Sequence, residues 1–148
     1  MSALTIITKE NPSLKQKSQG IASVTEEIKH LITDMSETME VNNGVGLAAP
    51  QVGHNIRLCL IKTEQGVLSL INPQITWKSW GQDIEEEGCL SCPQIFGLVK
   101  RYKAIKVKAL NQDGQPIKFK AKGFFARVIQ HEMDHLDGIL IVDKFIKS

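Results

Sequence analysis

Apolar residues recur with helical spacing in the first third of the chain. The positions are Ile28, Leu31, Ile32, Met35 and Met39. They lie 3, 4, 7 and 11 residues after the first, so an α-helix places them in one stripe. Ser23 with Glu26 three residues later resembles a capping box, and Asn42-Asn43-Gly44 is typical of a helix end. We predict an N-terminal helix whose apolar stripe packs against the core.

Shorter apolar segments then predict strands. Residues 56–62, 68–71 and 75–80 are expected to form three of them. Residues 44–53 are rich in Gly, Ala and Pro and predict a loop. Residues 81–101 contain Gly, Pro and a cysteine pair, and no regular element is assigned there.

Two later segments alternate between apolar residues and lysine. The apolar positions are Ile105, Val107, Ala109, Ile117, Phe119 and Ala121, and the lysines are Lys106, Lys108, Lys118, Lys120 and Lys122. Residues 111–115 between them are a turn signal. We predict a β-hairpin with one apolar face and one lysine face. We expect the lysines to form a solvated face rather than a nucleic-acid site.

A second helix is predicted over residues 123–136, with Gly138 placed to end it. Steps of 4, 3 and 4 residues give it one shared face, which we expect to be buried. That face carries Phe124, Val128, His131 and His135. A helix near each end, strands between them and no regular β-α alternation indicate an α+β fold. We expect residues 1–148 to form a single domain.

Composition excludes several classes of protein. Lys and Arg number 18 against 16 Asp and Glu, a net charge of +2, which argues against a nucleic acid or an anionic membrane as partner. No apolar run reaches the length of a membrane span, and the first residues lack the pattern of a secretory signal. We therefore expect a cytoplasmic protein, with an organellar or phage origin left open. The three cysteines are an odd number and predict no disulfide framework.

The clearest chemical signal is His131-Glu132-Met133-Asp134-His135, an H-E-x-x-H motif on the second helix. Histidines at positions i and i+4 can bind one metal ion, and the glutamate can polarise a water that the metal holds. Catalytic sites of this kind usually have three protein ligands. The third is open among His30, His54, Cys59, Cys89, Cys92 and the carboxylates. Cys59 lies within an apolar segment, which is more typical of a buried hydrophobe.

Three segments together resemble the signature motifs of the peptide deformylases. They are Gly44-Val45-Gly46-Leu47-Ala48-Ala49-Pro50-Gln51, Glu87-Gly88-Cys89-Leu90-Ser91 and Gln130-His131-Glu132-Met133-Asp134-His135. They occur in the family's order, and the similarity covers most of the chain. The resemblance implies antiparallel β-sheets packed around a C-terminal metal-binding helix, with an N-terminal helix.

The resemblance also implies a role for each motif residue. Cys89, His131 and His135 would bind the metal, and Glu132 would be the general base that later protonates the leaving amine. Gln51 and the backbone N–H of Leu90 would stabilise the oxyanion. The implied substrate-binding residues are Val45, Gly46, Gly88, Phe124 and Val128.

Two charged pairs bear on this site. Glu87 and Arg101 are a hypothetical ion pair that would hold the Cys89 loop in place. Arg127 and Glu85 lie near positions that are commonly apolar in the family, so the side-chain preference of the pocket stays open.

The implied reaction removes the N-formyl group from the initiator methionine of new polypeptides and releases formate. The expected cofactor is one divalent metal ion per chain, Fe2+ natively, with Zn2+, Ni2+ or Co2+ able to replace it, because the ligand types do not select among them. We expect a monomer that acts on N-formyl-Met nascent peptides. Many bacterial members dock on the ribosome through a C-terminal extension. Here 13 residues follow His135 (148 minus 135), which argues against docking of that kind and leaves ribosome association open.

Alternatives from other classes stay open. Cys92, where the family commonly has an apolar residue, forms C-x-x-C with Cys89 and would suit a structural Cys2His2 zinc site without catalysis. The long gap before the histidines, and the lack of a role for Glu132 and Gln51, count against it. Oxidation could instead join the two cysteines and expel the metal. The H-E-x-x-H motif alone would favour a metalloendopeptidase, although common zincins use His or Glu as third ligand.

Overall fold

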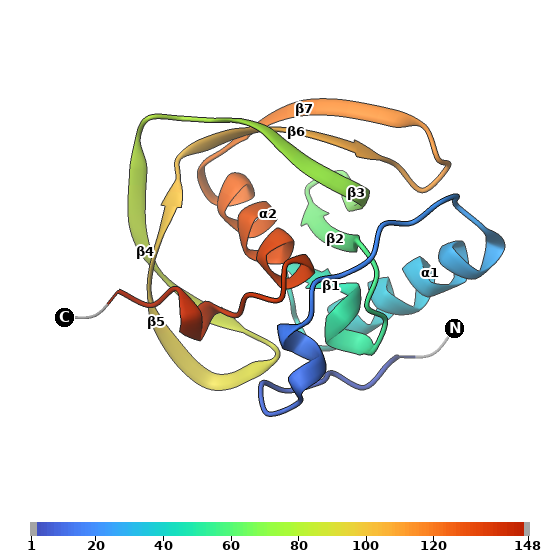
Figure 1. The fold of residues 1–148 in the computed structure, drawn as a ribbon, viewed down its shortest axis with the longest axis horizontal. Helices are drawn as coiled ribbons and strands as arrows, with labels where there is room; N and C mark the ends of the chain where they lie inside the picture. The colour runs from blue at the N-terminus through green and yellow to red at the C-terminus, as the bar shows by residue number, and fades with distance from the viewer. Residues whose placement is uncertain (1–2, 147–148) are drawn as a thin grey trace.

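The computed structural model describes residues 3–146. Within them the chain forms two α-helices and seven strands (Figure 1). In order they are α1 (Glu26–Val41), β1 (Gly46–Ala48), β2 (Leu58–Thr63), β3 (Gly66–Lys78), β4 (Gln82–Cys89), β5 (Cys92–Tyr102), β6 (Ala104–Leu110), β7 (Pro116–Lys122) and α2 (Gly123–Leu136). Short 3-10 turns are η1 (Pro12–Lys15), η2 (Ala49–Val52) and η3 (Ile141–Asp143). No helix in this part of the chain is long and apolar enough to cross a membrane.

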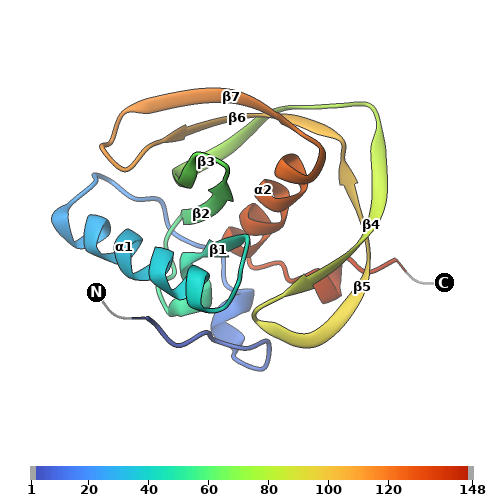
Figure 2. The same ribbon diagram turned by 180° about the vertical axis from the view of Figure 1, so that it is seen from behind.

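The strands form two antiparallel sheets on either side of α2. Five strands pair in the order β1-β2-β3-β6-β7, and β4 pairs with β5 in a separate hairpin. Both views show α2 enclosed between the larger sheet and this hairpin (Figures 1 and 2). The expected α+β fold, with antiparallel sheets around a C-terminal helix, is confirmed.

Alternation along the strands divides the core between the two helices. In β2, Cys59 and Ile61 pack with residues of α2, whereas Leu58 and Leu60 pack with the apolar stripe of α1. Successive side chains of a strand point to opposite faces of a sheet, so α1 and α2 cover opposite faces of β2. The predicted stripe of α1 is confirmed, since Leu31, Ile32, Met35 and Met39 are buried and Ile28 packs beside them.

Three local predictions were wrong. The N-cap of α1 is Thr25, whose hydroxyl accepts a hydrogen bond from the Ile28 N–H at 3.3 Å, and not Ser23. The two strands predicted at 68–71 and 75–80 are one strand, β3, which is interrupted by bulges. The predicted loop at 44–53 contains β1, which pairs with β2, and the 3-10 turn η2.

The predicted lysine hairpin is confirmed as β6 and β7, with Val107 opposite Phe119 and Lys106 opposite Lys120. Residues 81–101, to which the sequence assigns no element, form most of the long β4–β5 hairpin. This hairpin carries Cys89 to the side of α2 where the two histidines lie.

Candidate active site

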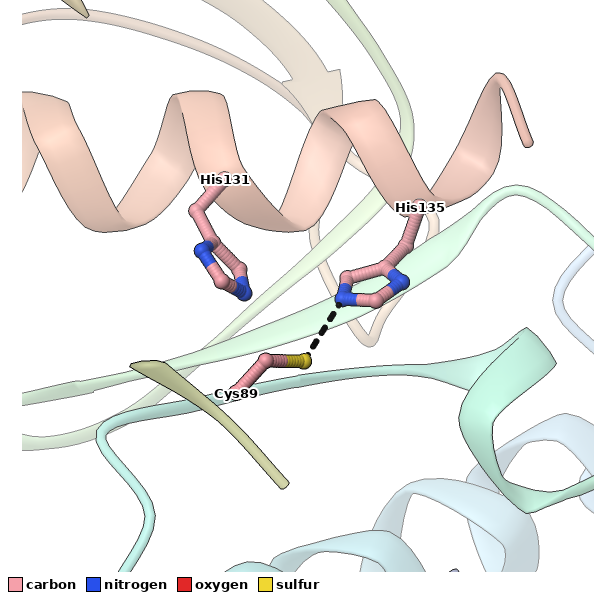
Figure 3. Close-up of side chains that lie close together, drawn as sticks. All are labelled: Cys89, His131 and His135. Carbon is pink, nitrogen blue, oxygen red and sulfur yellow. Dashed lines mark hydrogen bonds between the residues drawn. The ribbon is translucent and has the colours of Figure 1, made fainter. Parts of the chain in front are cut away.

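Cys89, His131 and His135 bring their donor atoms together between the end of β4 and α2. The sulfur and one nitrogen of each imidazole all lie within 4.8 Å of one another, and Cys89 Sγ is 3.3 Å from His135 Nε2. Figure 3 shows both rings pointing from α2 toward Cys89. Ligands bound to a tetrahedral ion at about 2.0–2.3 Å are about 3.5 Å apart, so the three donors fit one metal.

The protonation states of His135 and Cys89 bear on whether they can bind a metal. Burial lowers the pKa of His135 well below its usual value, so its imidazole is neutral and able to bind. The hydrogen bond with Cys92, together with burial, raises the pKa of the Cys89 thiol. A divalent cation beside the sulfur would reverse that preference and favour the thiolate.

His131 is held from behind by a buried carboxylate. Its Nδ1 lies 3.1 Å from Glu87 Oε1, which directs the ring's Nε2 toward the cluster. Burial opposes a charge on His131, but the carboxylates of Glu132 and Glu87 raise its pKa. A carboxylate behind a metal-binding histidine fixes both its tautomer and its orientation.

The predicted ion pair between Glu87 and Arg101 is confirmed. Arg101 donates from Nε and Nη2 to the two oxygens of Glu87 at 3.0 and 2.9 Å. Its Nη1 also donates to Asp134 on α2. Burial opposes the charge on Glu87, yet hydrogen bonds from His131 and Arg101 hold the pKa of that carboxyl well below its usual range.

A second arginine, Arg127, completes this cluster and was not predicted to do so. It is only 5% exposed, and its Nη1 donates to Glu87 and to the Val99 carbonyl. Its Nη2 donates to the carboxylate and to the carbonyl of Asp83. The guanidinium of Arg127 therefore joins the β4–β5 hairpin to α2. It also helps to fix the Glu87 carboxylate that contacts His131.

Glu132 lies on α2 beside the cluster and is 4% exposed. Its Oε2 is 4.0 Å from His131 Nε2, and its buried Oε1 has no hydrogen-bond partner among the described residues. Burial raises the pKa of this carboxyl to about 7, and a nearby cation would lower it. Such an oxygen in a cavity is placed to accept a proton from a water or a substrate.

Gly46 makes room for this carboxylate. A Cβ atom on Gly46 would lie 2.5 Å from Glu132 Oε2, closer than such contacts allow. Because Gly46 has no side chain, the Glu132 carboxylate can lie against the backbone of β1 at this position. The close contact with Glu132, rather than a turn, therefore explains the glycine at position 46.

The amide of Gln51 has a determined orientation. The backbone N–H of Ala48 can only donate, and it donates to Gln51 Oε1 at 2.9 Å. The amide nitrogen Nε2 therefore faces the other way, 3.1 Å from Ser91 Oγ and 3.6 Å from Cys89 Sγ. An N–H donor beside the cysteine is positioned to reach an oxygen that binds at the cluster.

A cavity of about 610 Å³ opens onto these groups. Its lining includes all the residues predicted to bind substrate, namely Val45, Gly46, Gly88, Phe124 and Val128. Phe124 was predicted to lie on the buried face of α2, but it is 65% exposed at the start of the helix. It lines the mouth of the cavity, as does the half-exposed Val45, because the first turn of α2 extends past the core.

The other candidate ligands lie elsewhere. His30 and His54 are exposed, as expected of ordinary surface histidines. Cys59 is fully buried in the core of α2, and burial raises the pKa of its thiol, so it acts as a small hydrophobe.

The sequence and the fold were compared with known proteins. The family model described as polypeptide deformylase matches residues 3–148. The chain belongs to the peptide deformylase family. The peptide deformylase of Dictyoglomus thermophilum is 47% identical over 138 residues, which are 93% of this chain and 90% of that protein. That of Halothermothrix orenii is 45% identical over 139 residues, with the same two coverages of 93% and 90%.

Solved structures agree with this assignment. The crystal structure of the Thermotoga maritima peptide deformylase superposes with a TM-score of 0.95 at 39% identity, covering 98% of this chain and 99% of that one. The Ehrlichia chaffeensis peptide deformylase, solved in complex with actinonin, has a TM-score of 0.95 at 36% identity, covering 99% and 91%. The chain is thus a metal-dependent deformylase that removes the N-formyl group from nascent polypeptides.

Cys92 forms the C-x-x-C pair with Cys89 in this deformylase. It lies directly opposite Cys89 in the β4–β5 register, across the turn at Leu90 and Ser91, and is 1% exposed. The hydrogen bond from Cys89 lowers the pKa of the Cys92 thiol to about 7. Among the described residues, the group whose donors converge contains Cys89 but not Cys92. This counts against the Cys2His2 alternative.

Leu90 also lines the cavity, and its side chain packs on the core of α1. The role of its backbone N–H as an oxyanion donor stays a prediction.

Proposed function

We propose that residues 1–148 form one catalytic domain in which Cys89, His131 and His135 hold the metal and Glu132 transfers the proton. The observation that carries this proposal is the convergence of the three donors within 4.8 Å, beside Glu132 and Gln51 in one cavity. Three protein ligands leave a position open, as catalytic sites require and structural sites do not.

A divalent ion in this position would supply a Lewis acid and a nucleophilic water at neutral pH. We propose Fe2+ as the native ion, with Zn2+, Ni2+ or Co2+ able to replace it. One thiolate and two imidazoles do not themselves select among these ions. The Glu87 carboxylate would keep His131 in the tautomer that binds metal through Nε2.

Glu132 is proposed to act twice on one proton. Its unpartnered Oε1 would first accept a proton from the attacking water, and the same carboxyl would then donate it to the departing amine nitrogen. The Gln51 amide, oriented by Ala48, and the Leu90 N–H would donate to the oxygen that becomes negative. One such donor is typically worth about 3 kcal/mol in the transition state.

The cavity supports a formylated methionine as the substrate. Val45, Phe124 and Val128 provide apolar contacts for its side chain at the mouth and wall. Gln51 and Glu132, both almost fully buried, bound the space at the reacting carbonyl. We propose that this space admits a formyl hydrogen and excludes an acetyl methyl.

We further propose that the enzyme acts as a monomer in the cytoplasm on N-formyl-Met nascent peptides. The free state of Cys59, Cys89 and Cys92 suits a reducing compartment.

The test compares three substrates under anaerobic conditions: formyl-Met-Ala-Ser, acetyl-Met-Ala-Ser and a peptide with only internal amide bonds. The proposal predicts rapid formate release from the first and little hydrolysis of the other two. Acetate release at a comparable rate would refute the proposed exclusion of the methyl group. Cleavage of the internal peptide would refute the proposed substrate.

A further inference from the structure

One surface of the enzyme carries five lysines and takes no part in the site described above. We call it the lysine face, and it consists of Lys106, Lys108, Lys118, Lys120 and Lys122, all exposed. The register of β6 and β7 sets Lys106 directly opposite Lys120 and Lys108 directly opposite Lys118. Opposite residues have Cβ atoms about 5 Å apart and project from the same side of the sheet.

Leu110, at the end of β6, packs with the core of α1 on this side of the sheet, but the lysines of β6 and β7 belong to neither core cluster. The alternate residues Ile105, Val107 and Phe119 pack toward α2 on the other side. The helix α1 packs on the same side as the lysines, but against β1 and β2 at the other end of the sheet. Figures 1 and 2 show β6 and β7 along the upper edge of the molecule, above α2.

An aromatic side chain lies among the lysines. Trp77 of β3 is opposite Lys106 and is 42% exposed. The ammonium groups of Lys106 and Lys120 lie 5.6 and 5.3 Å from the centre of its ring. The partly exposed ring of Trp77 therefore makes cation–π contacts with one lysine of β6 and one lysine of β7.

The positive charge of this face is not neutralised locally. None of its five lysines lies within 4.0 Å of a carboxylate oxygen in the salt bridges between described residues. The strands β3, β6 and β7 contain no Asp or Glu. Like charges directly opposite each other repel, so a polyanion that shields them would be bound favourably.

We propose that the lysine face binds single-stranded RNA without sequence preference. Lysines two residues apart on a strand are separated by about 6.8 Å, and neighbouring strands by about 4.8 Å, which forms a lattice of cations for successive phosphates. A base stacks on Trp77, as in proteins that combine a basic surface with aromatic rings.

The sequence alone favours a solvated face for these lysines, and we revise that expectation because Trp77 lies among them. The net charge of +2 argues against a nucleic acid only for the surface as a whole. The strand register gathers five lysines on one surface, and the net charge of the whole chain does not reveal this local positive charge. We favour RNA over a membrane, because the face carries five lysines and one partly exposed ring, Trp77, whereas elements that lie on a membrane bury a wide apolar face in lipid. The inference rests on the proposed function in one respect, since nascent chains are made where RNA is abundant.

The test uses the metal-loaded enzyme and a fluorescein-labelled single-stranded RNA of about 12 nucleotides, followed by anisotropy over a series of KCl concentrations. The variant carries Lys106→Ser, Lys108→Ser, Lys118→Ser and Lys120→Ser. Its control carries Lys17→Ser, Lys29→Ser, Lys62→Ser and Lys100→Ser, which removes the same charge from other exposed lysines. Formate release and the unfolding midpoint are measured for each protein, and we expect both to stay near wild type.

We expect the wild type to show a slope of about −3 in the plot of log affinity against log salt, as for four phosphate contacts. The lysine-face variant should bind at least about tenfold more weakly with a slope near zero, and the control should resemble the wild type. Equal weakening in both variants, or none in either, would overturn the proposal. So would tighter binding to phosphatidylserine vesicles than to RNA.

A second measurement does not depend on the multiple variant. The chain has two tryptophans, so Trp80→Phe leaves Trp77 as the only indole. Stacking of a base should quench its fluorescence on titration with the same RNA. Unchanged fluorescence at saturating RNA would refute the stacking. If the lysine-face variant loses RNA binding but releases formate normally, the RNA site is independent of the catalytic site.

Discussion

Glu87 is the residue whose replacement tests the support of the metal centre most sharply. Each of its oxygens accepts two hydrogen bonds: Oε1 from Arg101 Nη2 and His131 Nδ1, Oε2 from Arg101 Nε and Arg127 Nη1. In Glu87→Gln an NH2 group replaces one of the two oxygens. The two groups that donated to that oxygen then face a donor instead of an acceptor. With the NH2 group at the Oε2 position, the bonds from Arg101 Nε and Arg127 Nη1 are lost. At the Oε1 position, the bond from Arg101 Nη2 is lost and His131 keeps a partner only by changing its tautomer.

The expected cost follows from burial. Glu87 is 8% exposed, Arg101 3% and Arg127 5%, so water cannot replace the lost partners. Hydrogen bonds to charged groups are worth about 1.5–3 kcal/mol each, and breaking a buried ion pair costs about 3–5 kcal/mol. We expect Glu87→Gln to lower the free energy of unfolding by about 3–5 kcal/mol. It should weaken metal binding about 10- to 100-fold, because His131 loses its orienting partner.

Urea unfolding of the metal-free protein measures the first quantity, and competition with a chelator measures the second. Glu26→Gln is the matched control, since Glu26 is highly exposed and lies 3.7 Å from Lys29. The same chemical change there should cost less than about 1 kcal/mol and leave metal binding unchanged. If Glu87→Gln behaved like this control in both assays, the role assigned to the buried cluster would be wrong.

Four further predictions concern the catalytic groups. Gly46→Ala would place a Cβ 2.5 Å from Glu132 Oε2, so we expect formate release to fall about 100-fold with metal content unchanged; normal turnover would contradict the steric argument. Gln51→Ala should lower kcat about 100- to 1,000-fold with little change in metal content, and a change confined to KM would argue against an oxyanion role. Cys92→Ala should keep both metal and activity, whereas loss of metal with unfolding would favour the structural Cys2His2 site. Mild peroxide should oxidise the Cys89 and Cys92 thiols to one disulfide, with two waters formed from each peroxide, and the metal should be released. Full activity of the oxidised wild type would refute this. So would a mass loss of two hydrogens in the Cys92→Ala variant, because its disulfide could not contain Cys92.

The elements with a clear period were predictable from the sequence. The stripe of α1, the alternation of β6 and β7, and the two histidines one turn apart on α2 each follow from local spacing. By contrast, β4 contains Glu85-Glu86-Glu87-Gly88, which has no alternation of apolar and polar residues. It is a strand because it pairs with β5, and that pairing is a tertiary effect.

The sequence predicted the residues at the centre of the site, but not the residues around them that hold or accommodate their side chains. The motifs pointed to Cys89, His131 and His135, which the structure brings together. Arg127 is separated from Glu87 by 40 residues, and nothing in the local sequence connects the two. The role of Gly46 depends on the position of the Glu132 carboxylate across the fold, which spacing along the chain does not reveal.

The most direct test of the account is to measure formate release and bound metal in the same anaerobic samples. The samples are wild type, Glu132→Gln and Cys89→Ala, assayed with formyl-Met-Ala-Ser. The account predicts both metal and formate for the wild type, metal without formate for Glu132→Gln, and neither for Cys89→Ala. Wild-type formate release by Glu132→Gln, or full metal content in Cys89→Ala, would contradict it.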